Sequence, residues 1–518
     1  MKINIPQKIK GHQLSVENNK IILRNTLFMY LRMFFSLFVS LYTSRVVLQE
    51  LGVENFGIYS VVGGVVAMFS ILNASMGTAT SRFFNFEIGL NGDVQGVFTS
   101  ALIIHLFIAV LVFVAGVGLG YSVIFEYLNI DVTRQVAAKW VYALSLLTAC
   151  IAILQVPYSA LIISYEHFRA FAYLDILAVL LKLCIVFCLS AFGTDRLITY
   201  SALVFGVSCA MFICNSCYSM NKFCVSHFKL NVNQLLIRKM LSFSGWDLYG
   251  NASVLARSQG VNILLNIFFG PLLNAASGIA MQVQGAVMSF ASSALSAVRP
   301  QIVKSYASGD YQRTTFLVLN SAKFTYFILL MVSLPLILEM DYVLTLWLGN
   351  VPDFAVLFCQ YILVFNFIAN LSSVIVSAIH ATGNVKRPSL INGTLYLLVV
   401  PIAFLAYRYN FSAEIAYQVN IIMVIIGMLS NAWTLSILLP RFSFFQFINK
   451  VILPCGVCTI LVMIVAWLCM QQFEPGFYRL CLVSLTTALT TIITSYYLAI
   501  DRTMRVTIRN FILNKIKR

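Results

Sequence analysis

Long apolar stretches, each followed by a short polar segment, recur along almost the whole 518-residue chain. They are about 20 residues or longer, the length with which an α-helix crosses the hydrocarbon core of a bilayer. None shows the alternation of a membrane β-strand, so a closed barrel is excluded. The pattern predicts about fourteen transmembrane helices, near residues 26–47, 57–80, 97–120, 139–163, 169–192, 197–219, 243–269, 274–298, 314–337, 354–379, 389–407, 413–438, 447–470 and 477–499.

The composition strengthens this prediction of an all-α polytopic membrane protein. Hydrophobic residues make up 60% of the chain and charged residues only 10%, against about 25% charged residues in soluble domains. The first twenty residues are polar and lack the apolar core of a signal peptide. We therefore expect residues 1–20 to form a cytosolic N-terminal segment, and the first helix to be retained.

The distribution of positive charge predicts the orientation in the membrane. With the N-terminus inside, 24 of the 34 Lys and Arg residues fall on the cytosolic side, 6 fall outside and 4 lie within helices. Cytosolic loops are the ones enriched in Lys and Arg, so both termini are predicted to be cytosolic. Because the basic residues sit in short loops, the net charge of +16 does not indicate a nucleic-acid partner.

A weak internal repeat divides the predicted helices. Arg82 precedes Asp93 by eleven residues, and Arg299 precedes Asp310 by the same spacing, at an offset of 217. A second match, at an offset of 218, lies at the start of the fifth and eleventh helices. Two copies of six helices start on the same side, which is typical of parallel repeats with a cavity between two lobes. The predicted parts are an N-lobe (21–219), a cytosolic linker (220–240), a C-lobe (241–440), two added helices (441–500) and a basic cytosolic tail (501–518).

Two segments resemble a known family. The stretch from Thr43 to Val65 resembles the junction between the first two helices of bacterial polysaccharide flippases, whose form is LG-x-E-x-FG-x-Y. The matching positions are Leu51, Gly52, Glu54, Phe56, Gly57 and Tyr59. The stretch from Ala381 to Leu398 is similar to the turn between their tenth and eleventh helices. Those proteins are O-antigen and capsule exporters of the multidrug/oligosaccharidyl-lipid/polysaccharide (MOP) superfamily, and the plan of twelve plus two helices also agrees.

The resemblance implies a flippase of the bacterial inner (cytoplasmic) membrane. Its cargo would be an undecaprenyl-diphosphate-linked oligosaccharide, moved from the cytosolic to the periplasmic leaflet by alternating access. The lipid bilayer, a polysaccharide polymerase and a chain-length regulator are the implied partners, with no cofactor and with coupling to a Na⁺ or H⁺ gradient. The sequence carries no metal-ligand spacing and no set of catalytic residues in a loop, so we expect neither a metal site nor an enzyme.

Six ionisable residues fall inside predicted helices, where a central charge costs about 2.5–3.5 kcal/mol on insertion scales. They are Arg32, Asp175, Lys182, Asp247, Arg257 and Lys323. We expect the four cations to line the central cavity and bind the diphosphate of the cargo, since a guanidinium binds phosphate oxygens through two hydrogen bonds. The alternative is ion pairs between helices, or snorkelling for Arg32 and Lys323.

Two alternative roles are considered for each of the remaining charged residues. Asp175 and Asp247 are either partners of a cation or sites for a coupling ion. Arg82 and Arg299 are expected at the inner mouths of the two lobes, and ordinary positive-inside anchoring is the favoured explanation for them.

Two other functions compete with the flippase. A multidrug or small-molecule antiporter of the same superfamily would bind cations and favour an acidic cavity, whereas here cations outnumber acids. A membrane enzyme that joins sugars would need a large outer loop or a soluble domain, and the hydrophobic pattern leaves room for neither.

Overall fold

A computed structural model describes the chain in five ranges with short gaps. They are residues 25–120, 132–189, 195–227, 233–349 and 351–499, together with 505, and the first range has gaps at 37, 41, 44–45, 48–49, 52–54, 56–57 and 60–69. The predicted cytosolic segment 1–20, nearly all of the tail 501–518 and the first part of the second predicted helix lie outside the described residues. So do Gly52, Glu54, Phe56 and Gly57 of the junction motif.

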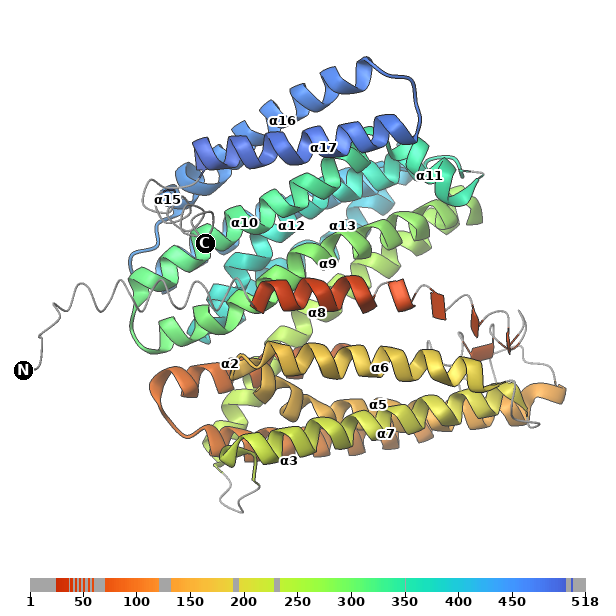
Figure 1. The fold of residues 1–518 in the computed structure, drawn as a ribbon, viewed down its shortest axis with the longest axis vertical. Helices are drawn as coiled ribbons and strands as arrows, with labels where there is room; N and C mark the ends of the chain where they lie inside the picture. The colour runs from red at the N-terminus through yellow and green to blue at the C-terminus, as the bar shows by residue number, and fades with distance from the viewer. Residues whose placement is uncertain are drawn as a thin grey trace, which may run out of the picture. The chain divides into compact units, whose positions relative to one another are not determined.

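All regular elements in the described ranges are helical, which confirms the predicted all-α class (Figure 1). Contacts divide the chain into two compact units, Met1–Leu248 and Tyr249–Arg518. The first contains α2 (Ser70–Leu90), α3 (Val94–Ala115), α5 (Gln135–Ser164), α6 (Phe168–Cys188), α7 (Arg196–Lys222) and the start of α8 (Gln234–Phe269). The second contains the rest of α8 and α9 (Pro271–Ala307), α10 (Tyr311–Leu338), α11 (Met340–Leu348), α12 (Ala355–Thr382), α13 (Lys386–Arg408), α14 (Ile415–Leu438), α15 (Phe444–Phe447), α16 (Leu453–Gln471) and α17 (Phe477–Thr494).

Each unit is a bundle of long antiparallel helices. In the first, α5 packs on α2, α3 and α7, and α6 packs on α7. In the second, α12 packs on α9, α10 and α14, and α16 and α17 pack on α10 (Figure 1). The main core of the second unit gathers large buried side chains such as Leu265, Phe358 and Leu363. Each predicted helix from the third to the fourteenth therefore has a counterpart in the structure.

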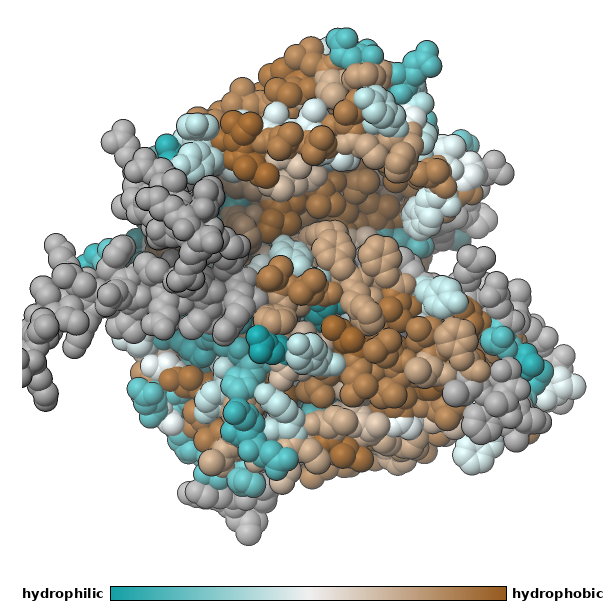
Figure 2. Space-filling view, viewed as in Figure 1, coloured by the Kyte–Doolittle hydropathy of each residue, from teal (hydrophilic) through white to brown (hydrophobic). Residues whose placement is uncertain are grey.

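The outer surface of these bundles is apolar, as a lipid solvent requires. Ten of the described helical segments are long and apolar enough to cross a membrane. On α16, for example, Ile460, Ile464 and Leu468 are half exposed or more, and Figure 2 shows mainly apolar residues over the visible helices. By contrast, α2, α8 and α9 are long but too polar to count among the ten. Helices of that kind lie against protein or line a polar path.

The two segments of the predicted repeat form similar turns, with the closing bond one position later in the second, and the repeat itself stays a prediction. After α2, the N–H of Gly92 donates to the carbonyl of Glu87, and after α9 the N–H of Asp310 donates to the carbonyl of Ser305. Asp93 and Asp310 then begin the next helices, each accepting a hydrogen bond from a backbone N–H three residues on, at 2.8 and 2.9 Å. A carboxylate at this position satisfies a free N–H of the first helical turn.

Three predicted boundaries are wrong. The second and eighth helices continue to Leu90 and Ala307, about ten residues past their predicted ends. Both continue because a stretch of mixed polar and apolar residues remains helical beyond the apolar run. The seventh begins at Gln234 and not near 243, since the Asn233 side chain accepts from the N–H of Leu236 at 3.1 Å and starts it early. Part of the predicted linker 220–240 is therefore helical.

The two added helices are fixed to α10 by polar bonds at three levels. Arg479, at the start of α17, pairs with Glu339 at 2.7 Å, and the Glu339 side chain is fully buried. Tyr326 of α10 bonds Thr459 of α16 at 2.8 Å. Lys323 donates to the carbonyl of Ala499, just after α17, also at 2.8 Å. The nine-residue helix α11, which the apolar pattern did not predict, begins directly after Glu339.

We predict that Arg479→Gln destabilises the protein more than Glu339→Gln. The first change leaves a fully buried carboxylate without its counter-charge, whereas the second leaves an arginine that is 15% exposed. Breaking a buried pair from one side costs about 3–5 kcal/mol. Thermal unfolding of the purified variants measures the effect, with the exposed Arg408→Gln as the control. A double variant as destabilised as the sum of the two single variants would contradict the pairing.

Labelling of single cysteines tests the predicted orientation. In a background without the other cysteines, the exposed native Cys224, near the end of α7, is expected on the cytosolic side. A new cysteine at the exposed Thr345, in α11, is expected outside. A membrane-impermeant maleimide added from the periplasm should modify Thr345→Cys and miss Cys224. The reverse pattern would invert the topology.

Candidate functional site

Arg257 is a buried cation of α8 in the second unit. Its side chain is only 8% exposed. The guanidinium carbon lies 5.0 Å from the ring centre of Phe365 and 4.8 Å from that of Tyr396. Nη1 donates to Oδ1 of Asn420 on α14 at 2.5 Å. The two rings and the amide hold the guanidinium in place, and cation–π contacts of this kind stabilise a desolvated charge.

A pocket opens beside this guanidinium. It is small, with a volume of about 30 Å³, and lies between α8, α9, α12 and α14. Its polar lining residues are Arg257, Ser258, Asn262, Ser277, Gln284, Tyr417 and Asn420. Tyr417 donates to Ser277 at 3.0 Å, and Ser277 donates to Asn262 at 2.7 Å. The lining therefore combines one positive charge with neutral hydrogen-bonding groups.

No carboxylate lines this pocket, and within the described part of the chain Arg257 has no ion pair. A charge removed from water without a counter-charge carries a penalty of several kcal/mol even after the structure relaxes. The rings and Asn420 offset only part of that penalty, because all three partners are neutral. The site is thus suited to attract a negatively charged group.

Arg32 shows the opposite arrangement in the first unit. Its Nη1 lies 3.3 Å from Oδ2 of Asp175 on α6, and Ser36 donates to the same oxygen at 3.1 Å. The guanidinium carbon also lies 5.3 Å from the ring centre of Phe171. Of the two predicted roles of Asp175, the structure supports that of a partner to a cation. Because this pair neutralises itself, Arg32 is less suited to bind an anion than Arg257.

The other two predicted cations differ from each other. Lys182 of α6 is exposed in its own unit and stays a candidate for the cargo. Lys323 is only 6% exposed, and its ammonium group donates to the Ala499 carbonyl. This bond fixes the added helices, and the predicted role of Lys323 in holding the cargo stays a prediction. Asp247 is buried on α8 at 8% exposure, and its role as a coupling-ion site stays a prediction.

Arg82 and Arg299 lie within helices and not in the loops after them. Arg82 belongs to α2, where its guanidinium carbon lies within 5 Å of the ring centres of Phe83 and Phe86. Arg299 lies in the last third of α9. Both helices run past their predicted ends, which moves each arginine from a loop into a helix. Their location at inner mouths stays a prediction.

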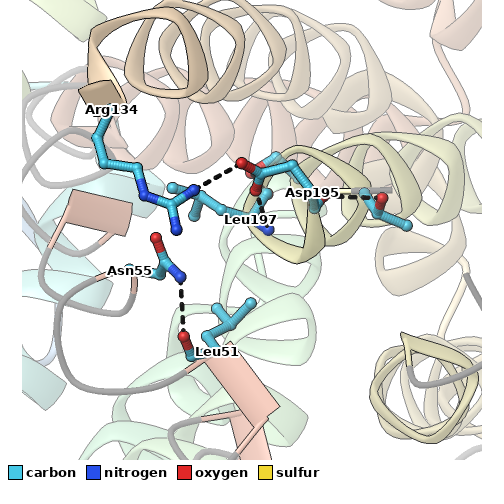
Figure 3. Close-up of polar contacts among 7 residues, drawn as sticks. Leu51, Asn55, Arg134, Asp195 and Leu197 are labelled. Atoms are coloured by element: carbon cyan, nitrogen blue, oxygen red, sulfur yellow. Dashed lines mark hydrogen bonds and ion pairs between the residues drawn. The ribbon is translucent and has the colours of Figure 1, made fainter. Parts of the chain in front are cut away.

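Two separate sets of polar contacts lie near the described part of the junction motif in the first unit (Figure 3). Arg134 pairs with Asp195 at 2.7 Å, and Asp195 also accepts from the N–H of Leu197 at 2.9 Å. Asn55 donates to the carbonyl of Leu51 at 3.0 Å. Leu51 belongs to a buried cluster with Val47, Val186 and Leu189. The packing of Leu51 on Val186 and Leu189 suits a structural role for the motif, because it joins the motif to the end of a helix that is distant in the sequence.

Sequence reasoning missed the partners of Arg257. Phe365, Tyr396 and Asn420 lie more than 100 residues away along the chain and belong to three different helices. Nothing in the local sequence marks the two aromatic residues among the 65 Phe and Tyr of the chain. Asn420 gives the one usable signal, because an amide inside an apolar helix needs a polar neighbour.

Comparison with solved structures places this fold among transporters. One match is a crystal structure of MATE in the straight conformation, with a TM-score of 0.71 and 15% identity over 81% of this chain and 97% of that one. Another is an outward-facing multidrug resistance MATE family transporter of the MOP superfamily (TM-score 0.69, 14% identity, 81% and 96% covered). A third is a MOP superfamily transporter from Pyrococcus furiosus, described as having a binding pocket of reverse polarity that suggests a different function (TM-score 0.66, 15% identity, 81% and 96% covered). No family model matches the chain, and no curated protein matches it in sequence. The chain therefore has the fold of MATE transporters of the MOP superfamily, at identities that establish the fold alone.

We predict that Arg32 and Asp175 can be exchanged. Arg32→Asp alone places two carboxylates about where the ion pair stood, and Asp175→Arg alone places two guanidinium groups there, so each should lower the yield of folded protein. The double exchange restores opposite charges and should recover most of that yield, with a coupling of about 0.5–3 kcal/mol. Size-exclusion chromatography of fluorescent fusions measures the yield, with Lys182→Gln as the control. A double variant no better than the worse single variant would refute the pair.

Proposed function

We propose that this chain, which has a transporter fold, moves an undecaprenyl-diphosphate-linked oligosaccharide from the cytosolic to the periplasmic leaflet. The repeat unit would belong to O-antigen, capsule or a similar polysaccharide. The observation that carries the proposal is the buried guanidinium of Arg257, which faces a pocket without a carboxylate. A diphosphate supplies the missing negative charge, and its oxygens accept the paired N–H groups of a guanidinium.

The polar residues of α8 and α9 support a path for the sugar. Exposed, uncharged hydrogen-bonding residues lie along both helices of the second unit: Asn251, Gln259 and Asn266 on α8, and Gln282 and Ser292 on α9. Against lipid such side chains would lose their hydrogen bonds. Along a polar path they can bond sugar hydroxyls, while the apolar lipid tail remains in the bilayer. The likeness of the junction motif to polysaccharide flippases points to the same cargo.

A multidrug antiporter is the second candidate, and the comparisons favour it in one respect. One of the similar structures is described as a multidrug resistance transporter. A pocket for cationic drugs needs negative charge, however, and the pocket beside Arg257 carries positive charge instead. The polarity of this pocket therefore favours an anionic cargo.

We predict that Arg257→Gln and Lys182→Gln each reduce polysaccharide export about tenfold or more, and that the double variant abolishes it. A hydrogen bond to a charged group contributes about 1.5–3 kcal/mol, and about 1.4 kcal/mol is a factor of ten. The assay is complementation of a flippase-deleted strain, read as surface polysaccharide and as lipid-linked repeats trapped in the cytosolic leaflet.

Two controls interpret this assay. Arg408→Gln, an exposed arginine at the end of α13, should export as the unmodified chain does. Each variant must also be present in the membrane in equal amount. Export that persists with both Arg257 and Lys182 changed would refute the role of these cations. A chain that fails to complement but raises tolerance to cationic drugs would favour the multidrug antiporter.

A further inference from the structure

The pocket beside Arg257 is lined by several hydrogen-bond donors and by no carboxylate. One N–H of the guanidinium bonds Oδ1 of Asn420, which leaves Nδ2 of that amide as a further donor at the pocket. Asn262 accepts from Ser277 through Oδ1, so its Nδ2 is likewise available. Next to the lining, the fully buried Nδ2 of Asn366 has no hydrogen-bond partner among the described residues. Donors of this kind around one guanidinium make a site for an anion.

The guanidinium cannot reach water by rotating away. Phe365 and Tyr396 lie at 5.0 and 4.8 Å from its central carbon, and Asn420 bonds its edge. Arg257 also lies near the middle of the 36-residue α8, far from either end of the helix. It therefore stays buried and positive whether or not a cargo headgroup is present. Arg32 differs from Arg257 in this respect, because Asp175 of the same chain supplies its counter-charge.

We propose that the Arg257 pocket binds a small inorganic anion such as chloride between cargo loads, and that the diphosphate of the cargo displaces it. The anion provides the counter-charge that no described carboxylate provides, and Arg257 and the Nδ2 groups of Asn420 and Asn262 donate to it. The displacement step rests on the proposed function, whereas the anion site itself does not. Loading of cargo then releases the small anion from the protein.

The test uses the purified full-length protein in detergent, titrated with sodium chloride from a low-salt zwitterionic buffer. A ligand that binds the folded state raises the unfolding temperature in a saturable way. We expect a rise of about 2 °C or more for the unmodified chain and for Arg408→Gln, and none for Arg257→Gln beyond the general effect of salt. Equilibrium binding of radiolabelled chloride provides a second readout that does not depend on stability.

Asn420→Asp is the decisive variant. It places a carboxylate of the same shape against Nη1 of Arg257, so the counter-charge becomes part of the chain. We expect this variant to bind labelled chloride at least tenfold more weakly, and to unfold at the same temperature with and without chloride. If it does not fold, Arg257→Gln tests the same point, because removal of a buried charge leaves no unpaired ion behind.

Inorganic pyrophosphate separates the anion site from the proposed function. If the unmodified chain binds chloride and pyrophosphate displaces it, both steps of the proposal are supported. Chloride binding that pyrophosphate does not affect keeps the site and overturns the displacement. If the unmodified chain shows no chloride effect, or Arg257→Gln shows the same effect, the anion site is refuted, while the export assay still decides the flippase independently.

Discussion

The need to balance a charge that is buried away from water governs how this protein is built. Arg479 lies against Glu339, Arg32 lies against Asp175, and Lys323 donates to a backbone carbonyl. Each of these contacts also joins helices that are distant in the sequence, so balancing a charge and fixing the fold are achieved by the same bonds. Arg257 has no such carboxylate among the described residues, and it differs from Lys323 in lying beside a pocket, with two rings and a neutral amide as its described partners. A buried cation that lacks a carboxylate partner, as Arg257 does among the described residues, is therefore the best candidate for binding an anionic ligand.

The two units share a plan but differ in their electrostatics. The turns after α2 and α9 are built alike, with a helix end that closes on itself and an aspartate that begins the next helix. The charges do not match in the same way, since the half-buried Arg32 has a carboxylate partner and the buried Arg257 has none among the described residues. The two units therefore share the local structure of these turns but differ in their interior charges.

Most of the fold could be predicted from the sequence, but only a part of the candidate site could. The difference has a physical reason. Apolar length decides where a helix can cross a bilayer, so α10, α12 and α14 lie close to their predicted ranges. The start of α8 depends on one capping side chain, and α11 is too short for the apolar pattern to reveal it. The charge inside a predicted helix marked Arg257 as a candidate, and its role stays a prediction. The charge could not tell that residue from Lys323, because what separates them is a partner far along the chain.

The three polar ties along α10 have a mechanical consequence. They extend from Lys323 to Glu339, which is about 24 Å of helix at 1.5 Å per residue, and they hold both α16 and α17. A pair of helices fastened at several levels cannot slide or pivot independently of its support. Any movement of α10 therefore carries this pair with it, as one body with its support.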